Sequence, residues 1–239
     1  MPRPAYFLSK HAFGCLSGSS VVLLDLKADR YLALEASRAC SLDGLVAGWP
    51  ALATELPVPA PETGVRIAAS MLKRGLLTSE PAHGKVFKSP SVTAPVDSAI
   101  DAADQAEMPL RLQHVRAFAA CLTTARFNLR FRSMEWIVDD VRRRRARARR
   151  RAGPQELAIR QLALLFDRLR AFTYNARDAC LFDSLAMLYF MLREGCQPQW
   201  VIGVRSSPSF MAHSWIQHGA TVLNDSIDHV SVYTPIMAE

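Results

Sequence analysis

Apolar side chains occupy nearly every position between Asp178 and Gly195, and this stretch constrains the fold more than any other. Asp178 suits a helix N-cap, because its carboxylate accepts hydrogen bonds from unpaired backbone N–H groups, and Gly195 suits the left-handed position after a helix. A helix that is apolar nearly all round is buried. At roughly 16 residues, and with Asp183, Ser184 and Arg193 inside it, the segment is too short and too polar to span a membrane. The sequence therefore predicts a central helix in a chain whose residues are 50% hydrophobic.

Cys180 falls in the first turn of this predicted helix, where the positive end of the helix dipole favours a thiolate. A lone cysteine is more often a small buried core residue, so the position alone does not indicate catalysis. Downstream, residues 199–205 are rich in β-branched and aromatic side chains, and so are residues 210–225. These segments are predicted strands, and they place two further polar residues within reach of Cys180.

Those two residues, His213 and Asp225, lie on a predicted hairpin formed by residues 211–217 and 221–227. If the turn is centred on Gly219, the two side chains are directly opposed, with Cβ atoms about 4.5–5.5 Å apart. A carboxylate in that position orients the imidazole. A two-residue turn would instead place them on opposite faces of the sheet, so the pairing depends on this register.

A cysteine at a helix N-terminus, followed by a histidine and a carboxylate on adjacent strands, is typical of papain-like and transglutaminase-like sites. In this interpretation Cys180 is the nucleophile, His213 the general base and Asp225 the group that holds the imidazole in the correct tautomer. Asp228 is the alternative carboxylate if a bulge shifts the register. The remaining histidines, including His229, are predicted to have no catalytic role.

Four short motifs occur in the C-terminal half: Cys180-Leu with Ser184-Leu, Ile202-Gly203-Val204, Ala212-His213-Ser214-Trp215 and Val222-Leu223-Asn224-Asp225. With these motifs, residues 110–239 resemble the B protein (leader peptidase) of lasso-peptide biosynthesis and its transglutaminase-like cysteine protease domain. The family's catalytic Cys, His and Asp fall on Cys180, His213 and Asp225. The family often has Ala where this chain has Ser214. The resemblance implies a cysteine peptidase without a cofactor or a metal.

Residues 1–79 read as a small winged-helix-like unit, with strands at 20–26 and 31–35 and helices at 36–48 and 62–75. This pattern resembles the RiPP recognition element, a PqqD-like domain in which a leader peptide adds as a strand to the third β-strand, beside the last helix. β-Augmentation of this kind uses the unpaired backbone groups of an edge strand. The residues expected to contact the leader are Arg30, Tyr31, Leu32, Leu34, Ile67, Met71 and Arg74.

Together these observations predict an α+β chain: a PqqD-like domain at 1–79, a flexible linker at 80–108 and a papain- or transglutaminase-like domain at 109–239. Prolines and an acidic, alanine-rich stretch favour the linker. The expected partners are the precursor peptide and, by family resemblance, an asparagine-synthetase-like macrolactam synthetase. The resulting product class would be an antibiotic-type lasso peptide.

The net charge of +7 is local, because eight arginines fall in residues 142–151 and without them the chain has 21 basic and 22 acidic residues. The basic balance is therefore no argument for a nucleic-acid surface. The arginine run is either a solvated helix face or a docking site for an acidic surface, and self-repulsion favours disorder without a partner.

The chain has five cysteines with no CxxC pair, which favours free thiols in a reducing cytoplasm. Neither a signal peptide nor a membrane span is expected. Two other functions remain open at this stage. An acyltransferase or true transglutaminase uses the same triad with an amine as acceptor. A non-catalytic delivery module would keep Cys180 only as a core residue.

Overall fold

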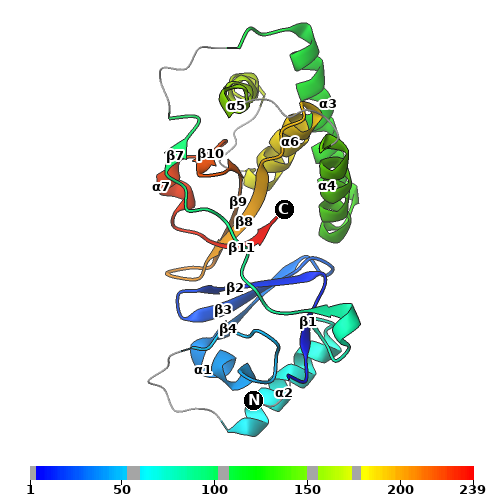
Figure 1. Cartoon of the computed structure of the whole chain (residues 1–239), viewed down its shortest axis with the longest axis vertical. Coiled ribbons are helices and arrows are strands. Elements are labelled where there is room, and N and C mark those ends of the chain that lie inside the picture. Colours follow the sequence, from blue (N-terminus) through cyan, green and yellow to red (C-terminus); the bar gives the residue numbers. More distant parts are fainter. Residues whose placement is uncertain (1–3, 53–59, 102–107, 150–155, 174–178) are drawn as a thin grey trace. The chain divides into compact units, whose positions relative to one another are not determined.

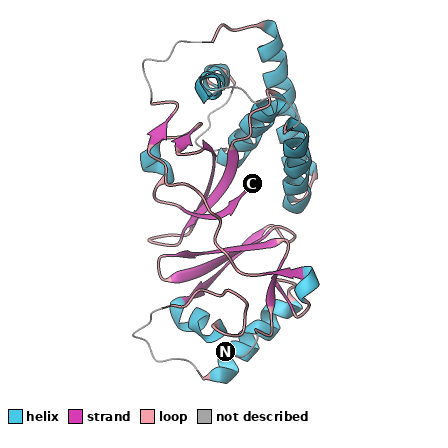
Figure 2. Cartoon of the chain, viewed as in Figure 1, coloured by secondary structure: helices cyan, strands magenta, loops and turns pink. Residues whose placement is uncertain are grey.

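A computed structural model describes the chain at residues 4–52, 60–101, 108–149, 156–173 and 179–239 (Figure 1). The architecture is mixed α+β, and both helices and strands recur along the chain (Figure 2). The chain divides into two compact units. Unit 1 comprises Met1–Pro90, Val204–Met211 and Thr234–Met237, and unit 2 comprises Ser91–Gly203, Ala212–Tyr233 and Ala238–Glu239. No helix in the described ranges has the length and apolar character needed to cross a membrane.

Unit 1 contains two small antiparallel sheets. The first has the order β2-β3-β4, with β2 at Ala12–Ser17, β3 at Ser20–Asp25 and β4 at Arg30–Glu35. The second has the order β5-β1-β6, with β5 at Leu77–Thr78, β1 at Phe7–Ser9 and β6 at Gly84–Lys85. The predicted strands at 20–26 and 31–35 are thus present. β4 lies at one edge of this sheet.

β2 was not predicted, because its large apolar residues are interrupted by Gly14, which weakens a strand pattern. The structure shows why a glycine stands there. A Cβ at Gly14 would lie 2.3 Å from the ring of Phe87, so only glycine leaves room for that ring. Phe87 is 5% exposed and belongs to the unit 1 core. The strand therefore depends on a residue that lies 73 positions later in the chain.

The predicted helix at 36–48 is shorter than expected. Only α1 at Ala36–Ala39 and the 3-10 turn η1 at Cys40–Leu42 form. Gly44 then adopts φ +72°, a conformation that ends helical geometry. The following helix, α2 at Pro61–Lys73, matches the prediction closely and begins with a proline in its first turn.

The segment predicted as a flexible linker, 80–108, carries regular structure in its described part. It forms η2 at Pro81–His83, then β6, then β7 at Asp97–Ser98, which pairs with a strand near the C-terminus. Backbone pairing and the burial of Phe87 fix it despite its prolines. Residues 102–107 lie outside the described residues, and the division into domains at 79 and 108 stays a prediction.

Unit 2 is built around four long helices. They are α3 at Leu112–Phe131, α4 at Met134–Ala148, α5 at Glu156–Arg170 and α6 at Cys180–Arg193. α3, α4 and α5 all contact α6 (Figure 1). Every residue of α6 from Asp183 to Leu192 is buried, so the prediction of a buried central helix is confirmed. Ring contacts tie it to its neighbours: the Phe166 and Phe190 centroids are 5.7 Å apart.

A five-stranded sheet has the order β11-β8-β9-β10-β7. Its further strands are β8 at Gln199–Arg205, β9 at Met211–His218, β10 at Thr221–Val222 and β11 at Thr234–Ala238. The one-turn helix α7 at Ile227–Val230 follows β10. This turn was not predicted, because residues 221–227 read as one continuous strand.

The N-terminal end of α6 differs from the prediction, whereas the C-terminal end agrees with it. Asp178 lies outside the described residues, and Ala179 precedes the first helical residue without a side-chain cap. At the other end Gly195 has φ +84°, as expected for the left-handed position after a helix. There the N–H of Cys196 donates to the carbonyl of Met191 at 3.0 Å and closes the helix.

The arginine run is helical and not disordered up to Ala148. Acidic side chains on the same helix offset the repulsion. Arg144 Nε is 2.6 Å from Asp140 Oδ2, and Arg142 Nη1 is 3.2 Å from Asp139 Oδ1. Pairs three and four residues apart stabilise a helix in this way. Arg150 and Arg151 lie outside the described residues.

Candidate active site

Cys180 is the first residue of α6 and is partly exposed. A hydrogen bond with His213 lowers the pKa of the Cys180 thiol, and backbone N–H groups of Ser214 and Leu181 add to this effect against the influence of burial. The N-terminal end of the helix dipole also favours the thiolate. Buried cysteines elsewhere behave in the opposite way: burial raises the pKa of Cys196 to about 12. Among these thiols Cys180 has the environment of a nucleophile.

His213 lies on β9, is 8% exposed, and has its Nε2 at 2.6 Å from Asp225 Oδ2. Because Nε2 faces Asp225, Nδ1 is the ring nitrogen left to meet Cys180. Burial disfavours the imidazolium, but hydrogen bonds to Asp225 and Cys180 outweigh it and raise the pKa of His213 to about 9. At neutral pH these shifts favour a thiolate and an imidazolium as an ion pair.

Asp225 is half-buried and accepts several hydrogen bonds. Burial acts to raise the pKa of Asp225, but the bonds from His213, from the Ser226 N–H and from His229 hold it below its ordinary value. The Ser226 N–H donates to Asp225 Oδ1 at 2.8 Å. The carboxylate thus stays charged and supports the imidazolium of His213.

The hairpin register that led to this pairing was wrong. The turn has two residues, and the paired positions are Thr221 with His218 and Val222 with Gln217. A turn centred on Gly219 was expected instead. In an unbroken ladder, the observed register would turn His213 and Asp225 to opposite faces.

The two side chains meet because β10 ends at Val222 and the chain bends over 223–225. The side chain of Asn224 replaces the missing ladder. Its Oδ1 accepts from the Ile216 N–H at 2.8 Å, as a backbone carbonyl would. The bend releases Asp225 from strand alternation and lets its carboxylate turn towards His213.

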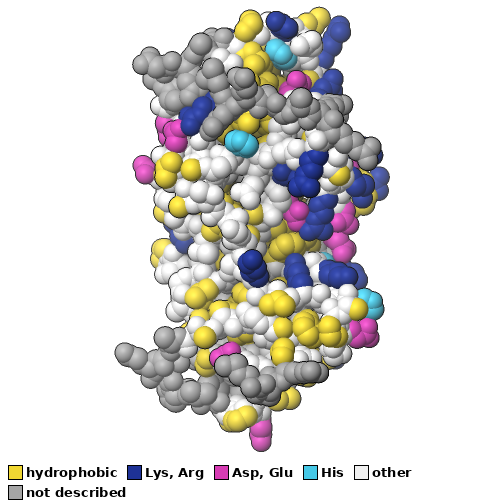
Figure 3. All heavy atoms as spheres, in the orientation of Figure 1, with side chains coloured by type: hydrophobic (Ala, Val, Ile, Leu, Met, Phe, Trp, Pro, Cys, Tyr) yellow, Lys and Arg dark blue, Asp and Glu magenta, His cyan; other side chains and the backbone are white. Residues whose placement is uncertain are grey.

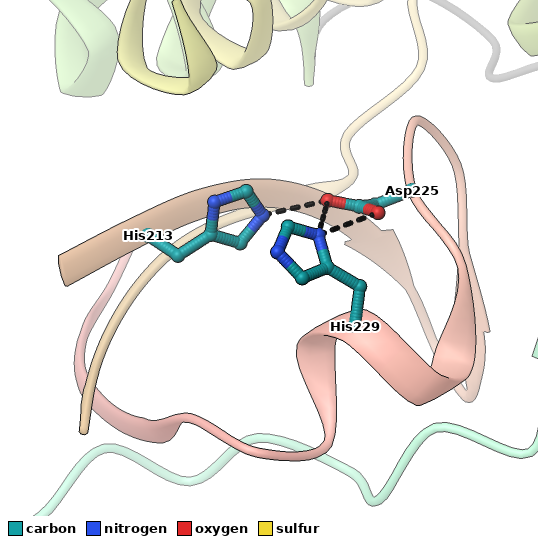
Figure 4. Close-up of side chains that lie close together, drawn as sticks. All are labelled: His213, Asp225 and His229. Atoms are coloured by element: carbon teal, nitrogen blue, oxygen red, sulfur yellow. Dashed lines mark hydrogen bonds and ion pairs between the residues drawn. The ribbon is translucent and has the colours of Figure 1, made fainter. Parts of the chain in front are cut away.

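His229 is a member of the site that sequence reasoning missed. Its Nδ1 is 3.0 Å from Asp225 Oδ1 and 2.9 Å from Oδ2, and its ring centroid is 4.4 Å from that of His213. Figure 4 shows both imidazoles directed at the one carboxylate. A usable signal was present: Ser226 caps α7, which places Asp225 and His229 one helical turn apart.

Asp228, the alternative carboxylate, does not join this group. Its side chain is exposed on α7, and its backbone carbonyl accepts from the hydroxyl of Ser231 at 3.2 Å. The bulge that would have brought it to His213 is replaced by the bend and the short helix.

A second polar network fixes the bend to the helices. Asp183, one turn after Cys180, is 2% exposed. Its Oδ2 accepts from Asn224 Nδ2 at 2.9 Å and from Arg170 Nη1 at 2.8 Å. A buried carboxylate with two such donors is stable, whereas an unpaired one is not. The network therefore locates Asn224, and with it Asp225, relative to the start of α6.

Ser214, where the lasso family often has alanine, has a structural role. Its Oγ lies 2.7 Å from Ser184 Oγ, and Trp200 Nε1 donates to it at 2.8 Å. All three residues are buried. This contact joins β9 to α6 next to His213 and Cys180.

These groups line a cleft of about 510 Å³. It contains the thiol, both imidazoles of the site and the Asp225 carboxylate, with Ser214 and Arg170 on its wall. Ligand atoms of His213, Asp225 and His229 also lie within 4.8 Å of one another, a spacing that a metal ion can use. Both oxygens of Asp225 already bond to imidazole, however, and the raised pKa of His213 makes a proton compete with any metal.

The site lies within a region that resembles known proteins. Residues 121–238 match the transglutaminase-like superfamily. The C-terminal half of the chain is thus a transglutaminase-like core domain, and Cys180, His213 and Asp225 all fall inside it. A search of curated proteins and a search of solved structures found no match.

The predicted leader-binding residues lie outside the transglutaminase-like core domain, on β4 and α2. Arg30 and Arg74 are exposed, and Tyr31, Leu32 and Ile67 are half-buried. Leu34 and Met71 are core residues, at 8% and 2% exposure. The side chains of Leu34 and Met71 are therefore not presented to a peptide on the surface. The identification of unit 1 as a leader-binding domain stays a prediction.

Proposed function

We propose that this chain is a cysteine peptidase that removes the leader from a ribosomally made lasso precursor peptide. The observation that carries the proposal is the arrangement of Cys180 at the start of α6, hydrogen-bonded to His213, with Asp225 at 2.6 Å from the imidazole, inside an open cleft. The transglutaminase-like core domain supports thiol chemistry at this position.

In the proposed reaction the Cys180 thiolate attacks the scissile carbonyl and forms a thioester with the leader. His213, as the imidazolium, gives its proton to the leaving amine, which is the N-terminus of the core. It then accepts a proton from the water that hydrolyses the thioester. The N–H of Cys180, at the first position of α6, has no acceptor within the helix itself and is a suitable donor to the oxyanion.

The leader would bind through unit 1. β4 is an edge strand, so a peptide can extend the sheet through backbone hydrogen bonds. Binding the leader there raises the effective concentration of the scissile bond at Cys180. The freed core amine would pass to an asparagine-synthetase-like macrolactam synthetase. Free thiols at all five cysteines suit a reducing cytoplasm.

The test uses a lasso precursor peptide encoded beside this chain and mass spectrometry of the products. Wild type should cut once, at the leader–core junction, and Cys180→Ala should not cut. Cys40→Ala is a matched control, because Cys40 is also a partly exposed thiol but lies in unit 1. Equal cleavage by Cys180→Ala would contradict the proposal.

An acyl transfer to an amine is a second candidate, favoured by the match to the transglutaminase-like superfamily. It uses the same thioester and differs only in the acceptor. Adding a primary amine such as cadaverine to the assay separates the two functions. Free leader acid supports the peptidase, whereas a leader–amine adduct as main product supports the transferase.

A further inference from the structure

The arginines of α4 fall into two groups. Some contact other parts of unit 2: Arg145 Nη2 donates to the carbonyls of Pro198 and Glu239, each at 2.6 Å, and Arg142 pairs with the Glu239 carboxylate. These contacts fix the C-terminus of the chain against α4. They explain part of the run as structural. The outward group on α4 is Arg144, whose Nε also bonds Asp140, and the exposed Arg147.

The outward group surrounds a hollow of about 260 Å³ between α3, α4 and α6. Arg144 and Arg147 reach it from α4, and Arg193 reaches it from the last turn of α6. Among the described residues that line it there is no Asp or Glu. Lys and Arg side chains gather over the part of the surface where α4 lies, as Figure 3 shows.

The field of these guanidinium groups reaches the wall of the hollow. Burial raises the pKa of Cys121 to about 11; Arg193 and Arg144 act to lower it, and Glu194 acts to raise it. Arg144 and Arg193 line the same hollow as this buried thiol. A concave site lined by one sign of charge concentrates counter-charge.

We infer that this hollow, the arginine pocket (Arg144, Arg147 and Arg193), binds a carboxylate side chain of an acidic segment on a partner protein. Arg144 is already oriented: its guanidinium lies 4.3 Å from the centroid of the Tyr189 ring, and its Nε bonds Asp140. A guanidinium held in this way keeps its remaining N–H groups available in a fixed direction, which suits a planar carboxylate.

The lining favours a glutamate or aspartate over a bare phosphate. Ala120, Ala148 and Leu192 form an apolar part of the wall, on which the methylene groups of an acidic side chain can pack. A nucleic acid is less suited, because Asp139 and Asp140 lie on the same helix and would repel a continuous phosphate backbone. An acidic protein segment can present one carboxylate without such repulsion.

The arginine pocket is separate from the active site. Cys180 and Arg193 are at opposite ends of α6, which at 14 residues is about 20 Å long. Variants at the arginine pocket should therefore leave cleavage of a bound precursor unchanged. That separation allows the proposal to fail while the peptidase assignment stands, and the reverse.

The test is fluorescence anisotropy of the full chain with a labelled peptide of four Glu-Ala repeats. The comparison probes are the Gln-Ala counterpart and a labelled oligonucleotide of eight thymidines. The double variant Arg147→Gln/Arg193→Gln should bind the acidic peptide about tenfold less tightly, the loss of one charge-assisted contact or more. The matched control is Arg38→Gln/Arg66→Gln, which removes the same charge from exposed positions of unit 1.

A lysine pair, Arg147→Lys/Arg193→Lys, keeps the charge and should bind with intermediate affinity, since it loses the bidentate geometry. Equal losses in the unit 1 control would show a general charge effect and overturn the proposal. Tighter binding of the oligonucleotide, lost in the same double variant, would reassign the arginine pocket to nucleic acid and also overturn it. Displacement of the acidic peptide by equimolar inorganic phosphate would overturn the preference for a carboxylate.

Discussion

The charged side chains at the two ends of helix α6 are arranged differently. At the N-terminal end Cys180, His213 and Asp225 form a connected set in which each charged group has a partner, and Asp183 and Arg170 do the same beneath it. At the C-terminal end the arginine pocket brings together three guanidinium groups with no acidic residue among its described lining. The first set is suited to moving a proton within the site, and the three guanidinium groups of the second are suited to an external anion.

The helix dipole fits both arrangements. Its positive end stabilises the Cys180 thiolate, and its negative end favours the cation of Arg193 in the last turn. The dipole contributes only about 0.3–1 kcal/mol at each end, so side-chain partners decide what each site does. The predictions below test whether the N-terminal set works as a connected unit and whether the α4 arginines contribute mainly to stability or to binding.

The largest effect is expected at Asp225. Asp225→Asn should lower kcat/KM for precursor cleavage by about 10³-fold, because the neutral amide no longer supports the imidazolium. It should also move the pKa of His213 down from about 9, since the bond to the Asp225 carboxylate is one of the causes that raise it. In wild type, activity should rise with deprotonation of Cys180 and fall as pH passes about 9, where His213 loses its proton.

The measurement is the pH dependence of kcat/KM for both proteins. In the variant the alkaline limb should shift to lower pH. Asp228→Asn is the control, because that carboxylate is exposed and outside the cleft. A variant with lower kcat but an unmoved alkaline limb would mean that Asp225 does not set the protonation of His213.

Alkylation should distinguish Cys180 from the other thiols. With its pKa lowered, Cys180 should react with iodoacetamide below pH 8 at least tenfold faster than the buried Cys15, whose pKa burial raises to about 12. Peptide mapping by mass spectrometry after short exposure gives the rates. Equal rates at the two sites would indicate that Cys180 is an inert core thiol and would favour the non-catalytic delivery module.

A smaller effect is expected at His229. It bonds both oxygens of Asp225, which in turn bonds His213, so it acts through the carboxylate and is a positioning residue. His229→Gln should lower kcat about tenfold with little change in KM, in keeping with the usual cost of losing an outer hydrogen bond. His229→Asn, with a shorter amide, should retain less activity than the Gln variant. No loss in either would show that Ser226 and His213 suffice to hold the carboxylate.

The smallest effect is expected at Arg142, whose pair with Glu239 lies at the surface of α4. Its side chain is 49% exposed, so solvent screens the ion pair. Arg142→Gln should lower the free energy of unfolding by less than about 1 kcal/mol. Urea denaturation measures this, and Arg143→Gln, equally exposed at 50%, is the comparison. A loss well above that of Arg143→Gln would mean that the C-terminal contact matters more than an exposed pair should.

Several features followed from local sequence. The continuous apolar run predicted α6, and Gly195 marked its end because the backbone there needs φ of +84°. The strands β3 and β4 and the helix α2 matched their patterns for the same reason: their periodicity and turn residues act within a few positions. Cys180 could be placed at a helix start, although the cap position is Ala179 and the predicted cap residue, Asp178, lies outside the described residues.

The contact between His213 and Asp225 was expected for a reason that proved incorrect. Sequence spacing predicted a hairpin turn centred on the single residue Gly219, whereas the turn has two residues. The contact depends instead on Asn224, whose side chain bonds Ile216 and Asp183, a residue 41 positions earlier in the chain. No pattern in the hairpin itself predicts that bond, because its partner lies on a different element.

The sequence by itself determined which segments are helical or extended, and which residue types are available for thiol chemistry, because these depend on neighbours within a turn or two. Only the tertiary structure decided which carboxylate and which second imidazole join His213, and which arginines remain facing outward. Those outcomes depend on packing between elements far apart in the chain: Asp183 on α6 accepts from Asn224 in the bend after β10, and Arg145 donates to the carbonyl of Glu239. Local preference selects the elements, and long-range hydrogen bonds select the site.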